Sequence, residues 1–309
     1  MVDLSKSVQL CALNQRTLIK VSGPDAQTFL EGQWTQHFSL EEDPQHHWAA
    51  LCSPKGKVLA TCLTWKQNND YWLSSPESNA AFLIAHLKKF LLRSRCTLTL
   101  EQDKISQWGL LSKDWPAIQQ ALQWPEIPLI GHWDEWNGCI RIRLDEQALY
   151  LLLTQEPIEK ITQQLQITTV QPSSVWPNHL LEQGILEIEA SNRDQWLPQH
   201  INLDLIQGIH FKKGCYTGQE IIARTHYLGS IKRRLLGFWV SEPPLPTLSS
   251  IHLTPTDTIV GHTVAVGPQT DLSTLILAIV PHPYQPHTLR LANGVLLEEP
   301  IPFNYAIPE

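Results

Sequence analysis

The sequence predicts an α+β fold in three parts. Two successive stretches repeat the element order β-α-β-β-α-β, and a third stretch, after residue 232, contains only short apolar runs separated by Pro, Gly and Asp. The repeated order is the split βαβ arrangement of ferredoxin-like domains. Hydrophobic residues make up 42% of the 309 positions, which is enough for more than one packed core.

The first part, residues 16–102, begins with a β-rich stretch and a short helix. The run TLIKVSG favours a strand, and Ser22 before Pro24 is a typical start for a helix that continues to Glu31. Apolar runs separated by the polar turns PKGK and NND then predict antiparallel strands. Apolar residues at mainly helical spacing predict a helix over residues 77–93. The expected strands are 17–23, 48–53, 58–65, 71–75 and 96–102.

The second part, residues 105–170, repeats this order of elements. Its apolar runs alternate with two amphipathic stretches, each followed by further β-rich sequence. The expected strands are 105–111, 139–144, 148–152 and 167–170, and the expected helices are 114–122 and 158–165.

The third part is a small all-β region. Six short apolar runs follow residue 232, as in a small β-barrel or sandwich, and Pro and Ser residues at 243–250 indicate a loop inside it. We therefore predict three domains. These are residues 1–103 together with 172–228, residues 104–171, and residues 229–309.

The charge of the chain argues against extensive nucleic-acid binding. Lys and Arg number 23 against 30 Asp and Glu, a net charge of -7, whereas proteins that coat phosphates carry clustered positive charge. The run KRR at 232–234 is more typical of a solvated strand end, although a local basic patch stays open. The longest apolar run, 275–280, is too short to span a bilayer, and the N-terminus does not resemble a signal peptide. We expect a soluble, cytoplasmic protein that contacts neither membrane nor, directly, nucleic acid.

Cysteine, histidine and tryptophan usage gives further expectations. The 6 cysteines form no CxxC pair, and the 13 histidines form no HxxxH or HxH motif beside a carboxylate, so we predict free thiols and no metal site. The 12 tryptophans exceed what core filling needs, and indole rings can stack on planar ligands. The surplus alone does not choose between ligand binding and core packing.

The segment FKKGCYTGQEIIAR, residues 211–224, carries the most chemical information. Lys212 and Lys213 precede Cys215, and neighbouring positive charge favours the reactive thiolate. Gly214 and Gly218 allow tight turns or close approach to a ligand. An ordinary cysteine in a surface turn explains the same residues equally well, because no nucleophile's partner stands at a recognisable spacing.

The motif KGCYTGQE resembles the signature of the YgfZ family, which is related to the aminomethyltransferase (T-protein) of the glycine cleavage system. Four further blocks, FLEGQWTQ, AALCSPKGK, WPNHLLEQGIL and WLPQHINLD, resemble family blocks and occur in the expected order. The resemblance implies two ferredoxin-like units around a central folate pocket and a C-terminal β-barrel. It also implies binding of tetrahydrofolate or another folate derivative, and a role in iron-sulfur cluster assembly.

The resemblance also assigns roles to individual residues. Trp176 matches a pocket tryptophan, which could stack on the flat pterin ring, and Glu182 falls where related proteins place a carboxylate that could accept two parallel hydrogen bonds from it. Arg16 stands where some members have a second pocket tryptophan. Without the resemblance, a core tryptophan and a solvated helix glutamate are the simpler interpretations. In the cysteine motif the implied functional thiol is Cys215 with Lys213, and the implied folate contacts are Gly214, Tyr216, Gln219, Glu220 and Arg224.

Besides Arg16, this sequence differs from the related aminomethyltransferases at a position that matters for catalysis. Aminomethyltransferases carry a pair of aspartates in a hairpin whose counterpart here is GKVLAT, with Ala60 and Thr61 at the acidic positions. Because no carboxylate is present there for proton transfer or electrostatic work, the transferase reaction is disfavoured.

Because of this resemblance we expect a folate-binding protein that supports assembly or repair of iron-sulfur clusters. Its expected partners are iron-sulfur enzymes or assembly factors, such as a tRNA methylthiotransferase, so that any effect on tRNA modification is indirect, and we expect no stand-alone catalytic activity. Two alternatives stay open. One is a tetrahydrofolate-dependent one-carbon (aminomethyl or methyl) transferase, and the other is a module that binds RNA directly.

Overall fold

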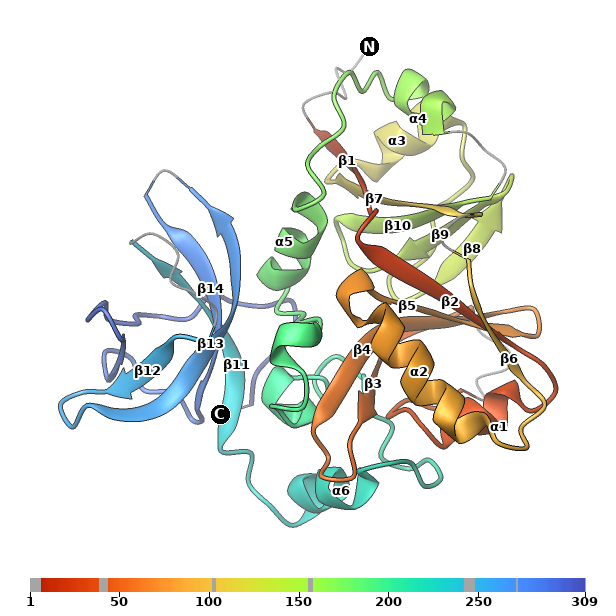
Figure 1. Cartoon of the computed structure of the whole chain (residues 1–309). Helices are drawn as coiled ribbons and strands as arrows, with labels where there is room; N and C mark the ends of the chain where they lie inside the picture. The colour runs from red at the N-terminus through yellow and green to blue at the C-terminus, as the bar shows by residue number, and fades with distance from the viewer. Residues whose placement is uncertain are drawn as a thin grey trace. The chain divides into compact units, whose positions relative to one another are not determined.

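The computed structural model describes residues 7–38, 44–101, 104–154, 158–241, 248–270 and 272–308 (Figure 1). Its strands form three five-stranded antiparallel sheets, which confirms the expected mixture of helices and antiparallel sheets. The chain divides into two compact units. The first consists of Met1–Glu31, His37–His47 and Cys62–Trp176, and the second of Gly32–Gln36, Trp48–Thr61 and Pro177–Glu309.

One sheet contains the strands expected from the first part of the sequence, in the order β3-β4-β5-β2-β6. The ends of these strands differ from the expected ends by no more than two residues. The expected long helix is divided into a short 3-10 helix, η2, and the helix α2. The elements are β2 (Arg16–Ser22), α1 (Ala26–Glu31), β3 (His46–Cys52), β4 (Val58–Gln67), β5 (Asp70–Pro76), η2 (Glu77–Asn79), α2 (Ala80–Leu91) and β6 (Thr97–Leu100).

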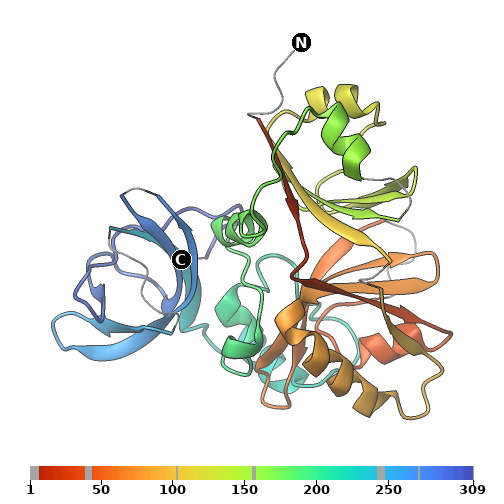
Figure 2. The ribbon, with the colours of Figure 1, turned by 45° about the horizontal axis from the view of Figure 1, so that its top comes forward.

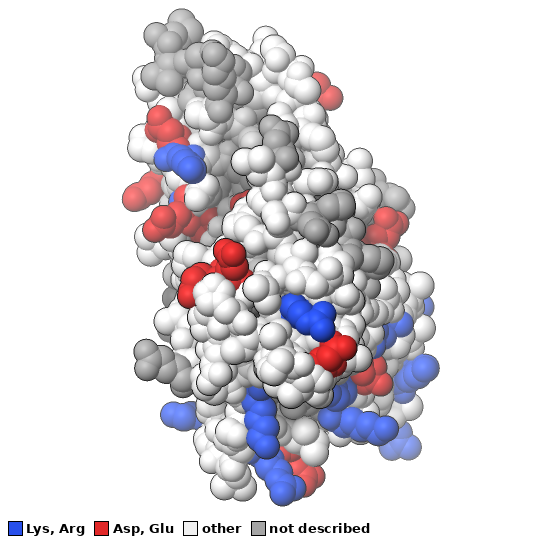
Figure 3. All heavy atoms as spheres, turned by 90° about the vertical axis from the view of Figure 1, so that its left-hand side faces the viewer, with Lys and Arg blue, Asp and Glu red and all other residues white. Residues whose placement is uncertain are grey.

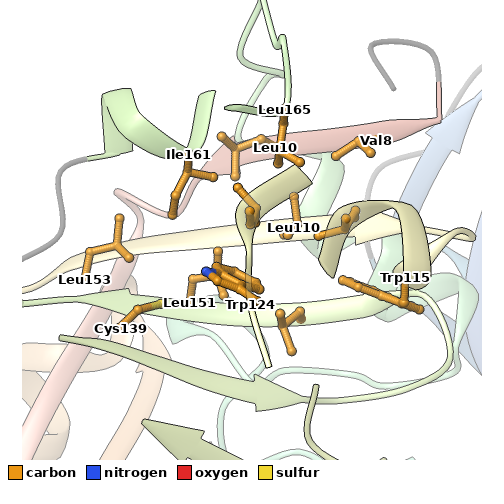
Figure 4. Close-up of a cluster of buried hydrophobic side chains, with 13 residues drawn as sticks. Val8, Leu10, Leu110, Trp115, Trp124, Cys139, Leu151, Leu153, Ile161 and Leu165 are labelled. Carbon is orange, nitrogen blue, oxygen red and sulfur yellow. The ribbon is translucent and has the colours of Figure 1, made fainter. Parts of the chain in front are cut away.

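The other sheet of the first unit has the order β1-β7-β10-β9-β8, and helices α3 and α4 lie on one face of it (Figure 2). Buried side chains from the helices and strands interdigitate there, among them Trp115, Ile161, Leu110 and Leu151 (Figure 4). The Asp114 carboxylate accepts a hydrogen bond from the amide of Ala117 and so caps α3. The elements are β1 (Val8–Ala12), β7 (Ser106–Ser112), α3 (Trp115–Leu122), β8 (Trp133–Trp136), β9 (Cys139–Arg143), β10 (Ala148–Leu153) and α4 (Ile158–Gln164).

One expected strand of this sheet is wrong. Residues 167–170 form no strand, and most of their side chains are exposed. The place beside β7 belongs instead to β1, where Val8 pairs with Ser112 and Leu10 with Leu110. The physical reason is burial, because Val8 and Leu10 on β1 are both buried in the core, whereas in ITTV only Ile167 packs against that core and Val170 is 42% exposed. The assignment of ferredoxin-like domains and their boundaries stays a prediction.

The third sheet lies in the second unit and has the order β11-β14-β13-β12-β15. It curls around a core that includes Phe238, Ile276 and Leu291, and β-bulges in β13, opposite both β12 and β14, allow the sheet to bend (Figure 1). Most of the expected loop at 243–250 lies outside the described residues. The elements are β11 (Arg233–Val240), β12 (Ser250–Leu253), β13 (Thr258–Gln269), β14 (Thr274–Pro281) and β15 (Leu289–Leu291).

A largely irregular region precedes this sheet in the second unit. It contains four short helical elements separated by turns in which Gly184, Asn202 and Gly218 have positive φ. The elements are α5 (Val175–Glu182), whose first two residues still belong to the first unit, η3 (Ala190–Asn192), η4 (Pro198–Ile201) and α6 (Gln219–Tyr227). None of the helices in the described ranges is both long and apolar enough to cross a lipid bilayer.

Candidate functional site

Cys215 is the exposed cysteine of this chain. It lies in the loop before α6, and a Cβ atom built on the neighbouring Gly214 would meet no other atom within 4 Å. The thiol is therefore open to an incoming partner. Among the described residues, no three His, Cys, Asp or Glu side chains are arranged to hold a metal ion. The other cysteines are shielded, since Cys11, Cys52, Cys62 and Cys139 are buried and Cys96 is half-buried.

The buried side chain of Lys213 holds this loop in place by hydrogen bonds to the backbone of residues 34–36. Lys213 is only 8% exposed, and its Nζ donates hydrogen bonds to the backbone carbonyl of Trp34 at 2.8 Å and to that of Gln36 at 2.7 Å. The same ammonium lies 5.1 Å from the centre of the Tyr216 ring, within the range of a cation-π interaction. The described contacts thus assign Lys213 to holding the loop in place.

The segment that receives Lys213 is itself fixed by hydrogen bonds. The Thr35 hydroxyl donates to the carbonyl of Gly208 at 2.7 Å and accepts from the amide of Ala50 at 2.9 Å. The Gln36 side chain donates to the carbonyl of Gln207 at 2.7 Å. Residues 34–36 therefore form a rigid support for the chain that leads into the Cys215 loop.

The PKGK turn packs against the start of α6. Gly218, with φ of +84°, precedes the helix, and a Cβ atom there would lie 2.5 Å from the carbonyl oxygen of Ser53. A Cβ atom on Gly56, with φ of +71°, would lie 3.1 Å from Ile221. Both positions need glycine, because the backbone is left-handed and the neighbouring chain is close. The turn and α6 thus form one packed structure.

The other predicted residues of the motif lie around this structure. Tyr216 is buried, and burial raises the pKa of its hydroxyl. The Gln219 side chain donates to the carbonyl of Lys213 at 3.4 Å, which ties the first turn of α6 to the loop. Glu220 and Arg224 are exposed on α6. The structure therefore brings the motif residues together, with some inside the support and some on its surface.

Arg16 and Trp176 lie in the first unit and share Tyr150 as a neighbour. The Arg16 guanidinium donates to the Ser74 hydroxyl at 3.0 Å, and that hydroxyl lies 3.0 Å from the Tyr150 hydroxyl, which in turn donates to the side chain of Gln107. The ring centres of Tyr150 and Trp176 are 5.9 Å apart. Trp176 is 2% exposed, so stacking on a ligand would have to replace contacts that it now makes in the core.

A cavity of about 240 Å³ lies in the second unit, between α5, the segment that follows it and β13. Carboxylates of Glu187 and Glu189 line it, and burial together with the charge of Glu187 raises the pKa of Glu189. Glu182 is exposed at the end of α5 and is not part of the lining. The other lining residues are Pro177, Asn178, Leu180, Leu181, Ile185, Leu186, Ser191, Asn192, Val264, Ala265 and Val266.

Sequence reasoning missed the two carboxylates of this cavity. The signal was present in the run LEIEA, because residues two apart in an extended chain point to the same side. Glu187 and Glu189 therefore face the same way, while Ile188 between them is fully buried.

The hairpin position that carries aspartates in aminomethyltransferases contains only uncharged side chains here. Ala60 is fully buried, and the Thr61 hydroxyl accepts a hydrogen bond from the amide of Ile188 at 2.8 Å. Thr61 thus has a structural role, fastening β4 to the segment that lines the cavity.

The fold defines a class of protein with the architecture of an aminomethyltransferase. The structure superposes on the glycine cleavage system aminomethyltransferase T of Bartonella henselae with a TM-score of 0.75 at 15% sequence identity, covering 95% of this chain and 85% of that one. At this identity the likeness concerns the fold alone. No protein-family model matches the sequence.

Curated relatives narrow the class to a family. The chain is 30% identical over 243 residues to the tRNA-modifying protein YgfZ of Escherichia coli O157:H7, covering 77% of this chain and 73% of the relative. It is 29% identical over 240 residues to the tRNA-modifying protein YgfZ of Photorhabdus laumondii, covering 75% of this chain and 70% of the relative. It is 27% identical over 294 residues to the tRNA-modifying protein YgfZ of Hamiltonella defensa, covering 91% of this chain and 86% of the relative. The chain belongs to the YgfZ family.

Proposed function

We propose that this protein binds a tetrahydrofolate derivative and supports the assembly or repair of iron-sulfur clusters in client enzymes. The observation that carries the proposal is the exposed thiol of Cys215 on a loop that a buried lysine holds in place. Clients such as tRNA methylthiotransferases would make the effect on tRNA modification indirect. This agrees with the name of the relatives, tRNA-modifying proteins.

The Cys215 loop suits transient contact with a cluster or with a partner's thiol. One cysteine cannot hold a cluster that usually takes four ligands, so the cluster is cargo that is shared with a partner. Exposure of the thiol and the open space beside Gly214 leave room for that partner. A rigid support for the loop limits the conformational entropy that is lost on docking.

The cavity in the second unit fits the ring end of a folate. Its volume of about 240 Å³ is just below the roughly 300–1,000 Å³ of pockets that hold whole small molecules, so the pterin ring would fit and the glutamate tail would extend out of it. A carboxylate of Glu187 or Glu189 can accept parallel hydrogen bonds from the pterin ring N–H and amino group. Ile185, Leu186 and Val264 supply apolar walls. The helix that lines the cavity, α5, also carries Trp176.

A continuous set of contacts joins the cavity wall to the thiol loop. Beyond the cavity segment, Asp194 accepts a hydrogen bond from the Ser53 hydroxyl at 2.8 Å, and its amide donates to the carbonyl of Val58 at 2.8 Å. The carbonyl of Ser53 lies against Gly218 at the start of α6, just after Cys215. A ligand that orders the cavity wall would bias the position of the loop through these contacts, which is how folate binding would regulate the thiol.

Replacement of the thiol tests the cluster role. In cells that lack the endogenous protein, the Cys215→Ser variant should fail to restore the activity of iron-sulfur enzymes, whereas Cys96→Ser, which changes a half-buried thiol, should restore it. Full restoration by Cys215→Ser would end the thiol proposal.

A tetrahydrofolate titration followed by tryptophan fluorescence tests the folate role. Saturable binding is expected, weakened about 10-fold or more by Glu187→Gln or Glu189→Gln, because a bidentate hydrogen bond to a charge is lost. Trp176→Phe and Glu182→Gln test the two residues that the family resemblance implies. Absence of saturable binding by the unmodified protein would remove the folate assignment.

The alternative is a one-carbon transferase, which the fold of an aminomethyltransferase favours. Ala60 and Thr61 oppose it, since neither side chain can act as an acid, a base or a charged orienting group at that position. Turnover of methylene- or methyl-tetrahydrofolate by the purified protein, abolished in the cavity variants, would favour the transferase over the cluster role.

A further inference from the structure

The exposed positive charge of the second unit is concentrated around α6, although the chain as a whole carries a net charge of -7. Figure 3 shows several Lys and Arg side chains, with acidic ones among them, in the lower part of the face that it draws, and Figure 1 places α6 at that lower end. Glu220 and Asp194 are the acidic residues that the contacts place close to this group. We define the α6 surface by its cations, Lys55, Lys57, Lys212, Arg224, Lys232 and Arg233.

Contacts within the second unit connect these cations. The PKGK turn, which carries Lys55 and Lys57, packs on α6 through Gly56 and Ile221. Lys57 and Arg233 are close enough for their charges to interact. Arg234 does not belong to this surface, because it is 3% exposed and donates to both carboxylate oxygens of Asp204 at 2.7 and 2.9 Å.

Aromatic rings lie beside these cations at the C-terminal end of α6. The rings of Phe211 and His226 are stacked, with centres 3.7 Å apart and planes 13° apart, and His226 meets the edge of Tyr227 at 4.8 Å. Tyr227 is 60% exposed and the following Leu228 is 85% exposed. The Phe211–His226 stack supports Tyr227 and leaves it available to an incoming planar group.

We propose that the α6 surface binds single-stranded RNA, with phosphates on the cations and an unpaired base stacked on Tyr227. Positive charge that follows a backbone, together with an exposed ring, is the combination with which proteins bind single strands. An acidic protein partner fits less well, because stable protein interfaces need a buried apolar centre, whereas the most exposed apolar side chains here, Tyr227 and Leu228, lie together at the C-terminal end of α6. The proposal is independent of the folate and thiol assignments.

Fluorescence anisotropy of the full chain with a labelled RNA hairpin that presents a single-stranded loop tests this proposal. Binding should weaken steeply between about 50 and 300 mM KCl. The slope of the logarithm of the binding constant against the logarithm of the salt concentration should decrease in magnitude by about 1.4 for Lys232→Gln/Arg233→Gln, because two phosphate contacts are lost. Tyr227→Ala should weaken binding about 10-fold and Tyr227→Phe should restore it, because stacking needs the ring and not the hydroxyl.

A matched control is available in the first unit. Lys88→Gln/Lys89→Gln removes the same charge from exposed positions on α2 and should leave the affinity and the salt slope unchanged. Three results would overturn the proposal. The first is no saturable RNA binding at about 50 mM KCl, and the second is an equal effect of the Lys232/Arg233 and Lys88/Lys89 variants on RNA binding. The third is an RNA affinity that Tyr227→Ala does not alter, together with poly-glutamate binding as tight as that of RNA. The last result would show a surface that recognises an acidic protein.

Discussion

Replacing Lys213 by Met should destabilise the second unit strongly. The side chain keeps a similar length but loses two hydrogen bonds, from a charged donor to the carbonyls of Trp34 and Gln36, at 2.8 and 2.7 Å. Hydrogen bonds to charged groups are worth about 1.5–3 kcal/mol each, and loss of the cation-π contact with Tyr216 adds about 0.5–1 kcal/mol. Removing the cost of burying the ammonium offsets part of this sum. We expect a loss of about 3–5 kcal/mol, a large fraction of a typical stability of about 5–15 kcal/mol.

Urea unfolding followed by tryptophan fluorescence measures this loss. The control is Lys212→Met, which removes the same charge from an exposed neighbour and should change the free energy of unfolding by less than about 0.5 kcal/mol. In native buffer, the rate at which a thiol reagent modifies Cys215 should change in Lys213→Met and stay constant in the control. If the two variants cost the same, Lys213 does not anchor the loop and the reasoning fails.

Two further predictions concern residues around the site, and a third concerns His46, a buried residue of the first unit whose Nε2 lies 2.8 Å from the carbonyl oxygen of Arg143. Gly218→Ala should destabilise by about 2–4 kcal/mol, because its φ of +84° and a carbonyl oxygen 2.5 Å from the new Cβ both oppose a side chain. Arg234→Met should cost about 3–5 kcal/mol by leaving the buried carboxylate of Asp204 without its partner. Burial lowers the pKa of His46 to about 4 in the folded protein, from about 6.5 in the unfolded chain. As the pH falls below about 6.5, the unfolded chain therefore takes up a proton that the folded protein does not. The free energy of unfolding should fall by about 2 kcal/mol between pH 7.5 and 5.

Each of these predictions has its own comparison. Gly214→Ala, at a position with open space and ordinary φ, should cost less than about 1 kcal/mol, and an equal cost at both glycines would contradict the steric argument. Arg233→Met, at an exposed position, should change the free energy of unfolding much less than Arg234→Met does. A larger loss of stability in Arg233→Met than in Arg234→Met would contradict the burial argument. The pH dependence of unfolding should be shallower in His46→Gln than in the unmodified protein. An unchanged slope would show that His46 is not the titrating group.

Local sequence patterns predicted the strands of the first part well because their turns are marked. The polar stretches PKGK and NND fall between apolar runs, and the strands begin and end close to them. The sequence analysis missed the strand β1 and wrongly expected a strand at 167–170. Which segment pairs with β7 depends on which one buries its apolar side chains in the core, and β1 does so with Val8 and Leu10. Such a choice is made by tertiary packing and leaves little local signal.

The candidate site was predictable where chemistry lies in neighbouring residues and unpredictable where it depends on distant ones. The motif around Cys215 is visible in the sequence, but the carbonyls that receive Lys213 belong to Trp34 and Gln36, on a segment far away in the chain. Likewise, the run KRR suggested three equivalent solvated charges, whereas Arg234 is buried against Asp204 and only its neighbours are exposed. Sequence alone shows the charge of a residue but not the partner that the fold supplies.

The division of the chain into interleaved segments has a consequence for its synthesis. The second unit takes Gly32–Gln36 and Trp48–Thr61 from early in the chain and the rest from Pro177 onward. At a synthesis rate of about 5–20 residues per second, those early segments leave the ribosome on the order of ten seconds before their partners exist. During that interval β3 and β4 can pair within their own sheet, but the contacts of both early segments with residues 177 onward cannot form. A chain that ends just after Trp176 therefore contains the whole first unit but only two short segments of the second, and no single cut in the gene separates one unit from the other.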